Sequence, residues 1–261
     1  MKFEDRMMEQ FSNLFLSLDH TNKTNAKVEA LASYFATAPE KDRLWAIALL
    51  SHRRPKRTVS TTLLRKWASE TANLPLWFFE ETYHIVGDLA EAIALVLPPS
   101  ELLKHRTLSE WIDVVRSWAT LEEDQKRQAV TEAWMQLDSP GRFVFNKLIT
   151  GGFRMGVSQK LMTRALSKAT GIDENILAHR LMGNWSPEDT TFESLVLTDH
   201  PSEDASRPYP FFLAHPLEAG PESLGHPSEW LIEHKWDGIR GQIIIRANQL
   251  FIWSRGEELM T

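Results

Sequence analysis

The sequence of 261 residues contains no cysteine, which excludes disulfide bonds and zinc sites with cysteine ligands. This composition is compatible with a reducing cytoplasm. The first residues are charged and lack the apolar core of a signal peptide, and no apolar run approaches the roughly 18 residues that a membrane-spanning helix needs. We therefore expect a cytoplasmic protein that does not associate with a membrane.

Acidic residues are missing from two long stretches, although the net charge of the chain is −6. These stretches lie between Asp42 and Glu70 and between Asp138 and Asp173, and they hold 13 of the 29 basic residues. Such islands on an acidic chain favour localised phosphate binding, and the alternative is a pair of solvated helix faces. The basic residues are Arg43, Arg53, Arg54, Lys56, Arg57, Arg65 and Lys66 in the first stretch, and Arg142, Lys147, Arg154, Lys160, Arg164 and Lys168 in the second.

Helical spacing of apolar residues dominates the chain up to about residue 182. Ser60 is expected to cap a helix, Thr107 opens a capping-box pattern, and Gly87-Asp88 predicts a break between two helices. Pro39 suits the first position of a helix. From Gly183 onward prolines follow closely and helical patterns become rare, which predicts a domain boundary there.

The aromatic and histidine residues of the helical region show no pattern that requires a functional site. Its tryptophans are expected in the hydrophobic core rather than stacked on bases. The isolated histidines are expected to be structural or exposed. No group of His, Asp and Glu has the spacing of a metal site, so we predict no metal-ligating side chain.

A lysine precedes an Asp-Gly turn signal in the segment Glu233-His234-Lys235-Trp236-Asp237-Gly238-Ile239-Arg240. Apolar residues on both sides, Ile232 upstream and residues 243–245 downstream, predict flanking strands. A lysine becomes a nucleophile when desolvation or nearby positive charge lowers its pKa, and an arginine two residues after the glycine suits contacts with phosphate or ribose. The alternative is an ordinary surface lysine before a hairpin turn.

Three glycines surround one arginine in the segment Thr150-Gly151-Gly152-Phe153-Arg154-Met155-Gly156-Val157-Ser158, and a helix is expected to start at Ser158. Glycines permit close approach of the backbone, and a helix N-terminus offers free N–H groups to a phosphate. On this segment alone, a tight turn between two helices is the better interpretation.

Together, these motifs resemble those of the bacterial ATP-dependent DNA ligases, which belong to the covalent nucleotidyltransferase superfamily. The pattern K-x-D-G-x-R at Lys235 resembles the nucleophile motif, and residues 254–257 resemble the S-R-x-G element, although Gly256 follows the arginine directly. Residues 151–156 resemble the G-x-L-R-x-G loop of the helical DNA-binding domain, with Phe153 in place of an aliphatic residue. Residues 209–217 resemble the entry to the adenylation domain.

The resemblance implies a mainly α chain in which residues 1–205 form a multi-helix DNA-binding domain. Residues 206–261 would then form the first strands of an α/β nucleotidyltransferase (adenylation) domain. It also implies an enzyme, expected as a monomer, that seals nicks in duplex DNA during replication, repair and recombination. ATP and Mg²⁺ are the implied cofactors, and a lysine-AMP adduct is the implied intermediate.

The resemblance also implies residue roles. Lys235 would be the catalytic nucleophile, Glu233 would lie at the adenine, Arg240 would contact the ribose, and Arg255 would hold AMP or the 5′-phosphate of the nick. The residues expected to bind DNA are Arg53, Arg54, Lys56, Arg57, Gly152, Arg154, Gly156 and Lys160.

The sequence departs from the family where it stops at Thr261, before the later nucleotide and metal motifs and the OB-fold domain. We therefore expect either a fragment of a longer ligase or a truncated product. One alternative function is a DNA-binding module without ligase activity. Another is a different nucleotidyltransferase, an RNA ligase or a capping enzyme, which the long helical region disfavours. An NAD-dependent ligase is less favoured still.

Overall fold

The computed structural model describes residues 7–51, 53–100, 103–153, 155–182, 185–198, 205–206, 208–211, 216–255 and 260. The chain divides into two compact units, which are Met1–Leu177 with Trp185–Thr198 and Ala178–Asn184 with Asp199–Thr261. We call them the helical unit and the hairpin unit. The expectation of a mainly α chain is confirmed, while the domain boundary at residue 205 stays a prediction.

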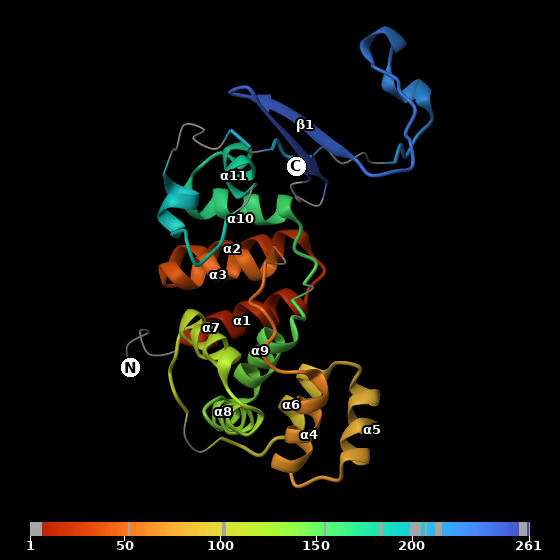
Figure 1. Cartoon of the computed structure of the whole chain (residues 1–261). Coiled ribbons are helices and arrows are strands. Elements are labelled where there is room, and N and C mark those ends of the chain that lie inside the picture. Colours follow the sequence, from red (N-terminus) through yellow and green to blue (C-terminus); the bar gives the residue numbers. More distant parts are fainter. Residues whose placement is uncertain are drawn as a thin grey trace. The chain divides into compact units, whose positions relative to one another are not determined.

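The helical unit is built from helices of about two to four turns (Figure 1). Those described are α1 (Met7–Asp19), α2 (Thr24–Thr37), α3 (Glu40–Leu50), α4 (Thr61–Thr71), α5 (Leu76–Val86), α6 (Leu89–Val96), α7 (Leu108–Ser117), α8 (Glu123–Met135), α9 (Ser139–Thr150), α10 (Gln159–Thr170), the start of α11 (Glu174–Leu181), the short 3₁₀ turn η2 (Trp118–Thr120) and the π-helical turn η3 (Glu193–Leu197).

Helix boundaries follow the capping chemistry of the sequence. The side chains of Ser60, Asp88 and Ser158 each accept a hydrogen bond from a backbone N–H in the first turn that follows. Thr107 forms the predicted capping box, and Gly87 ends α5 with a φ of +78°. These boundaries confirm the predictions made from the sequence.

Two helix pairs position the segments on either side of the glycine-rich loop. Helix α10 packs along α2, and α9 packs against α6 (Figure 1). Leu31 and Phe35 of α2 and Leu161 and Leu166 of α10 are buried, as their helical spacing predicts. Because burying one Leu or Phe side chain contributes about 1.5–3 kcal/mol, these interfaces hold both ends of the loop firmly.

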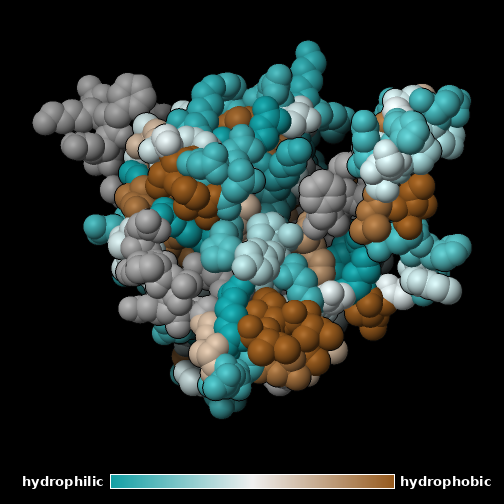
Figure 2. Space-filling model, turned by 90° about the horizontal axis from the view of Figure 1, so that it is seen from above, coloured by the Kyte–Doolittle hydropathy of each residue, from teal (hydrophilic) through white to brown (hydrophobic). Residues whose placement is uncertain are grey.

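Two details of the sequence-based prediction are wrong. Pro39 is the residue before α3 rather than its first residue, because its carbonyl oxygen accepts the first helical bond, from Arg43, at 3.0 Å. Trp77 is 68% exposed rather than in the core. Helix α5 carries apolar side chains on more than one side, but its neighbours α4 and α6 bury only Phe79 of it. Exposed hydrophobic side chains are common in this chain, and Figure 2 shows several separate hydrophobic patches on one face.

A buried carboxylate joins α3 to α7. Asp42 is 1% exposed, and its carboxylate accepts hydrogen bonds from the N–H groups of Leu108 and Ser109 and from the Ser109 hydroxyl. It therefore satisfies free N–H groups at the start of α7. Burial raises the pKa of Asp42 above its ordinary value, although the hydrogen bonds from Ser109 and Leu108 oppose the shift.

We expect the stability difference between the unmodified chain and Asp42→Asn to depend on pH. Because the pKa of Asp42 is higher in the folded state than in the unfolded state, the folded state binds the proton more tightly. The stabilisation from this proton is fully present below the unfolded pKa and is lost as the pH rises through the folded pKa. Urea unfolding between about pH 3.5 and pH 7 should therefore show the unmodified chain losing stability relative to Asp42→Asn. A difference that is constant, or that changes in the opposite direction, would contradict this prediction.

The hairpin unit contains an antiparallel pair, β1 (Gly241–Arg246) and β2 (Gln249–Ser254), and the short 3₁₀ turns η4 (Pro221–Leu224) and η5 (Pro227–Glu229). Ala247 and Asn248 connect the strands with φ angles of +48° and +59°, as in the two-residue turns that match strand twist. Ile244 and Trp253 are buried on one face of the hairpin. On the other face Ile243, Ile245 and Leu250 are 71%, 74% and 51% exposed, so this apolar face is uncovered.

Candidate functional site

The two basic stretches meet at the C-terminal end of α9. Arg54 donates a hydrogen bond from Nη1 to the carbonyl oxygen of Gly151, and Arg57 donates from Nη2 to the carbonyl oxygen of Thr150, each at 3.0 Å. These carbonyls lie at a helix C-terminus, where cations are favoured. The loop that follows α3 is therefore tied to the glycine-rich loop, although 97 positions separate Arg54 from Gly151.

Two observations favour a glycine at this junction. Its φ of +80° lies in the left-handed region, where other residues are strained. A Cβ atom built on it would also lie 1.9 Å from Nη1 of Arg54, so the Arg54 side chain would have to move away from the Gly151 carbonyl group. The glycine that the sequence analysis placed at a tight turn thus also admits the arginine from the other basic stretch.

The other residues predicted to bind DNA differ in their surroundings. Lys56 and Lys160 are exposed, Gly152 follows the junction directly, and Gly156 has a φ of +60°. Arg53 stacks over the ring of Trp185 at 4.6 Å from the ring centroid and donates from Nη1 to the Trp185 carbonyl oxygen at 3.0 Å. Arg154 lies outside the described residues.

Several charges counted in the two basic stretches are buried or already paired with a carboxylate. The Arg142 side chain is buried, with its residue only 2% exposed, and Lys147 is paired with Asp88. Arg65 is paired with Glu80 at 3.0 Å, and Lys168 is paired with Glu29. Each partner lies outside the acid-free stretch of its cation, so these pairs could not be predicted from charge counts along the sequence.

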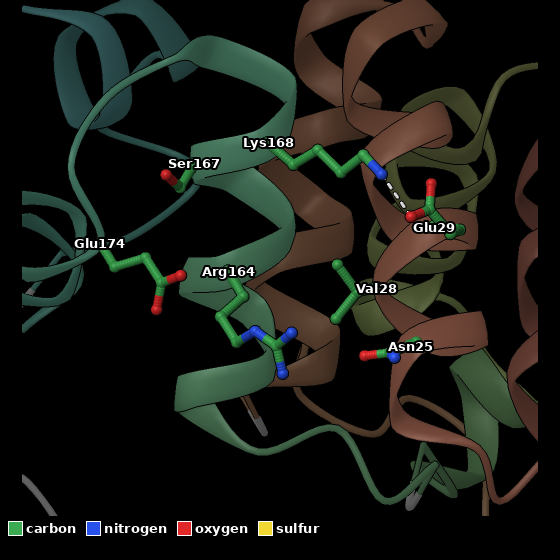
Figure 3. Close-up of a pocket in the computed structure, with 7 residues that line it drawn as sticks. All are labelled: Asn25, Val28, Glu29, Arg164, Ser167, Lys168 and Glu174. Atoms are coloured by element: carbon green, nitrogen blue, oxygen red, sulfur yellow. Dashed lines mark hydrogen bonds and ion pairs between the residues drawn. The ribbon is translucent and has the colours of Figure 1, made fainter.

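A cavity of about 360 Å³ lies between α2 and α10 (Figure 3). The ion pair between Lys168 and Glu29 spans one part of it. Arg164 extends into the same cavity and forms no ion pair with another described residue. The carboxylates of Glu29 and Glu174 also line this cavity, and the exposed Lys160 lies one turn before Arg164 on α10.

Two residues that the sequence analysis did not single out contact these loops. Trp185 stacks with Arg53, and nothing in its Pro-rich surroundings pointed to that role. Lys27 is buried and donates from Nζ to the carbonyl oxygen of Met155 in the glycine-rich loop, at 2.5 Å. A signal for Lys27 existed, because it lies within the apolar stripe of α2, four residues before Leu31.

In the hairpin unit, two of the predicted nucleotide contacts come together at the open end of the hairpin. The N–H of Arg255 donates to the carbonyl oxygen of Arg240 at 2.9 Å, one position beyond the last strand pair, Gly241 and Ser254. The backbones of Arg240 and Arg255 are therefore paired at this end of the hairpin.

Lys235 and Glu233 lie in an exposed segment of the hairpin unit. All of residues 231–240 are exposed. The strand predicted upstream of Lys235, around Ile232, is wrong, because the segment finds no strand to pair with among the described residues. Lys235 therefore lies on the exposed segment that leads to Arg240, and no described residues enclose its side chain.

Comparison with known proteins places this arrangement in a family. The family model "DNA ligase N terminus" matches residues 7–175. A probable DNA ligase of Koribacter versatilis is 26% identical over 252 residues, which cover 90% of this chain and 42% of the relative. A probable DNA ligase of Dictyoglomus thermophilum is 22% identical over 264 residues, which cover 95% of this chain and 45% of the relative.

The chain belongs to the DNA ligase N-terminal family. It spans less than half the length of the two curated relatives. Among the described residues, no helix has the length and apolar character that crossing a bilayer demands.

Proposed function

We propose that this chain is the N-terminal part of an ATP-dependent DNA ligase that seals nicks in duplex DNA. The observation that carries the proposal is the junction of the two basic stretches at Gly151, in a chain that belongs to a ligase family. The helical unit binds duplex DNA through phosphate contacts. The hairpin unit supplies the nucleophile Lys235.

The DNA contacts come from the residues around the glycine-rich loop and along α10. Guanidinium and ammonium groups neutralise phosphates whatever the base sequence, so binding depends on salt and little on sequence. Arg154 is the residue that we place nearest the minor groove, where base readout is degenerate. The contacting residues are Arg53, Arg54, Lys56, Arg57, Gly152, Arg154, Gly156, Lys160 and Arg164.

The reaction starts at Lys235, whose deprotonated Nζ attacks the α-phosphorus of ATP. A P–N bond forms and Nζ loses a proton to solvent, while the bond from the α-phosphorus to the bridging oxygen breaks and pyrophosphate leaves. Glu233 recognises the adenine, Arg240 the ribose, and Arg255 the transferred phosphate. Mg²⁺, when bound, supplies charge neutralisation for the leaving pyrophosphate.

Two further transfers complete the sealing of the nick. The 5′-phosphate oxygen of the nick attacks the adenylate phosphorus, so that a pyrophosphate bond to AMP forms, the P–N bond breaks, and the released Nζ of Lys235 takes up a proton from solvent. The 3′-hydroxyl then attacks the activated 5′-phosphorus, so that a phosphodiester forms, AMP leaves, and the hydroxyl proton passes to solvent.

A second candidate is a DNA-binding module that does not ligate, and the exposure of residues 231–240 favours it for this chain alone. Incubation with α-labelled ATP and Mg²⁺ separates the two candidates. A covalent adduct of AMP on the chain supports the ligase, whereas duplex binding without any adduct supports the module.

We expect the triple substitution Arg54→Gln, Lys56→Gln and Arg57→Gln to flatten the salt dependence of duplex binding. Each lost phosphate contact lowers the slope of log affinity against log salt by about 0.9, so the slope should fall by up to about three units. Fluorescence anisotropy on nicked duplexes of unrelated sequence measures this change, and the loss should be similar for each duplex.

The matched control neutralises the same charge away from the junction, with Lys104→Gln, Lys126→Gln and Arg127→Gln. This control should leave the slope close to that of the unmodified chain. Equal slopes for the unmodified chain and the Arg54, Lys56 and Arg57 variant would exclude the first basic stretch from the interface.

A further inference from the structure

Lys27 of α2 is a buried cation beneath the glycine-rich loop. The residue is 7% exposed, and its Nζ donates a hydrogen bond to the carbonyl oxygen of Met155 at 2.5 Å. Its neighbours on the buried side of α2 are apolar residues such as Val28 and Leu31. The loop therefore receives a charged donor from the interior of the helical unit.

This arrangement is expensive in a hydrophobic core. Removing an ammonium group from water costs several kcal/mol unless it is paired and hydrogen-bonded. Among the described residues Lys27 has no carboxylate partner, and the Met155 carbonyl oxygen is its one hydrogen-bond acceptor. An apolar residue at position 27 would continue the stripe of α2 without that cost, so stability of the core alone does not account for a lysine.

The contact with Met155 fixes the second half of the loop, as Arg54 fixes the first. Gly156 has a φ of +60°, and a Cβ atom on it would lie 3.2 Å from Lys27 Nζ, so the backbone passes close to the ammonium group. Phe153 is buried against Phe11, with ring centroids 6.0 Å apart. Charged donors thus hold carbonyl groups near both ends of the loop, and an aromatic anchor holds its middle.

We infer that Lys27 is a positioning residue for DNA binding, which holds Met155 and Gly156 of the glycine-rich loop in the conformation that meets the phosphate backbone. It acts through the Met155 carbonyl and does not itself contact DNA. Because the loop backbone is already ordered in the free protein, less conformational entropy is lost when the duplex binds. The inference rests on the proposed function, since it assigns to Lys27 a part in duplex binding.

Lys27→Met tests the inference, because methionine fills similar space without a donor or a charge. Lys23→Met is the matched control, since it removes the same charge from an exposed position one turn earlier. Loss of a hydrogen bond from a charged donor should raise the Kd for a nicked duplex about tenfold in Lys27→Met and less than about twofold in Lys23→Met. Backbone hydrogen exchange should rise in residues 151–157 of Lys27→Met alone.

Each outcome decides a distinct point. Equal affinity of both variants overturns the inference. Weaker binding of Lys27→Met with unchanged exchange in residues 151–157 also overturns it, because Lys27 would then act on the phosphate directly. If the unmodified chain does not bind the duplex, the proposed DNA-binding function fails. If Lys27→Met melts below the temperature of the assay, Lys27→Gln takes its place with the same expected outcomes, because the shorter side chain weakens the contact with Met155 but stays polar.

Discussion

Replacing Lys235 with alanine is expected to abolish the covalent AMP adduct completely. No other side chain of the hairpin unit is a lysine, and an alanine offers no nucleophile for the α-phosphorus. The test uses a protein that forms the adduct, which is either this chain alone or this chain joined to the remaining length of a relative. The same protein with Lys235→Ala should form no adduct. Intact-mass measurement reports the loss directly. Binding of nicked duplex by the helical unit should stay nearly unchanged.

Lys160→Ala is the control for this prediction, because it removes an exposed lysine of the helical unit. It should keep the full adduct and lose some duplex affinity, which is the opposite pattern. An AMP group that remains on the Lys235→Ala variant, located on another residue by peptide mapping, would disprove the assignment of the nucleophile.

Replacing Arg142 with methionine is expected to destabilise the helical unit by about 3 kcal/mol, because buried acceptors lose a charged donor. Its Nε donates to the carbonyl oxygen of Trp134, Nη1 donates to that of Pro98, and Nη2 donates to the Ser100 hydroxyl, each at 2.6 Å. Burial lowers the pKa of Arg142 from its ordinary value. The melting temperature should fall by roughly 6 to 12 °C.

Arg164→Met is the paired comparison, since both arginines come from the same basic stretch. Arg164 faces a cavity, so its loss should change stability by less than about 0.5 kcal/mol and lower the salt slope of duplex binding by about one unit. Arg142→Met should leave that slope unchanged. If Arg142→Met weakened DNA binding while keeping its melting temperature, the structural role of Arg142 would be refuted.

The contrast between these arginines shows what the sequence could and could not predict. Local chemistry was sufficient for the caps at Ser60, Thr107 and Ser158, because each depends on residues within one turn. Local chemistry was also sufficient to predict that the glycine-rich loop forms a turn between two helices. The burial of Arg142 depends on the segment 97–100, more than 40 positions earlier, and no pattern near Arg142 indicates it.

Some residues of the candidate site could also be predicted from the sequence, and others could not. The family resemblance singled out Lys235, Arg240 and Arg255 from short motifs, and the hairpin register brings the two arginines together. The strand expected near Ile232 does not form, because a strand needs a partner that no local pattern supplies. The contact of Arg54 with Gly151 could not be predicted either, since charge counts show where cations occur along the sequence and not which groups they contact.

The uncovered face of the hairpin determines what an unfolding experiment on this chain would measure. A two-stranded hairpin with Ile243, Ile245 and Leu250 in water contributes little cooperative stability. Heat absorption and the dependence on denaturant would therefore come almost entirely from the helical unit, where the buried surface lies. The calorimetric unfolding enthalpy divided by the full chain length would therefore fall below the enthalpy per residue that is typical of globular proteins. The size of this difference would report how much of the chain unfolds without a cooperative transition.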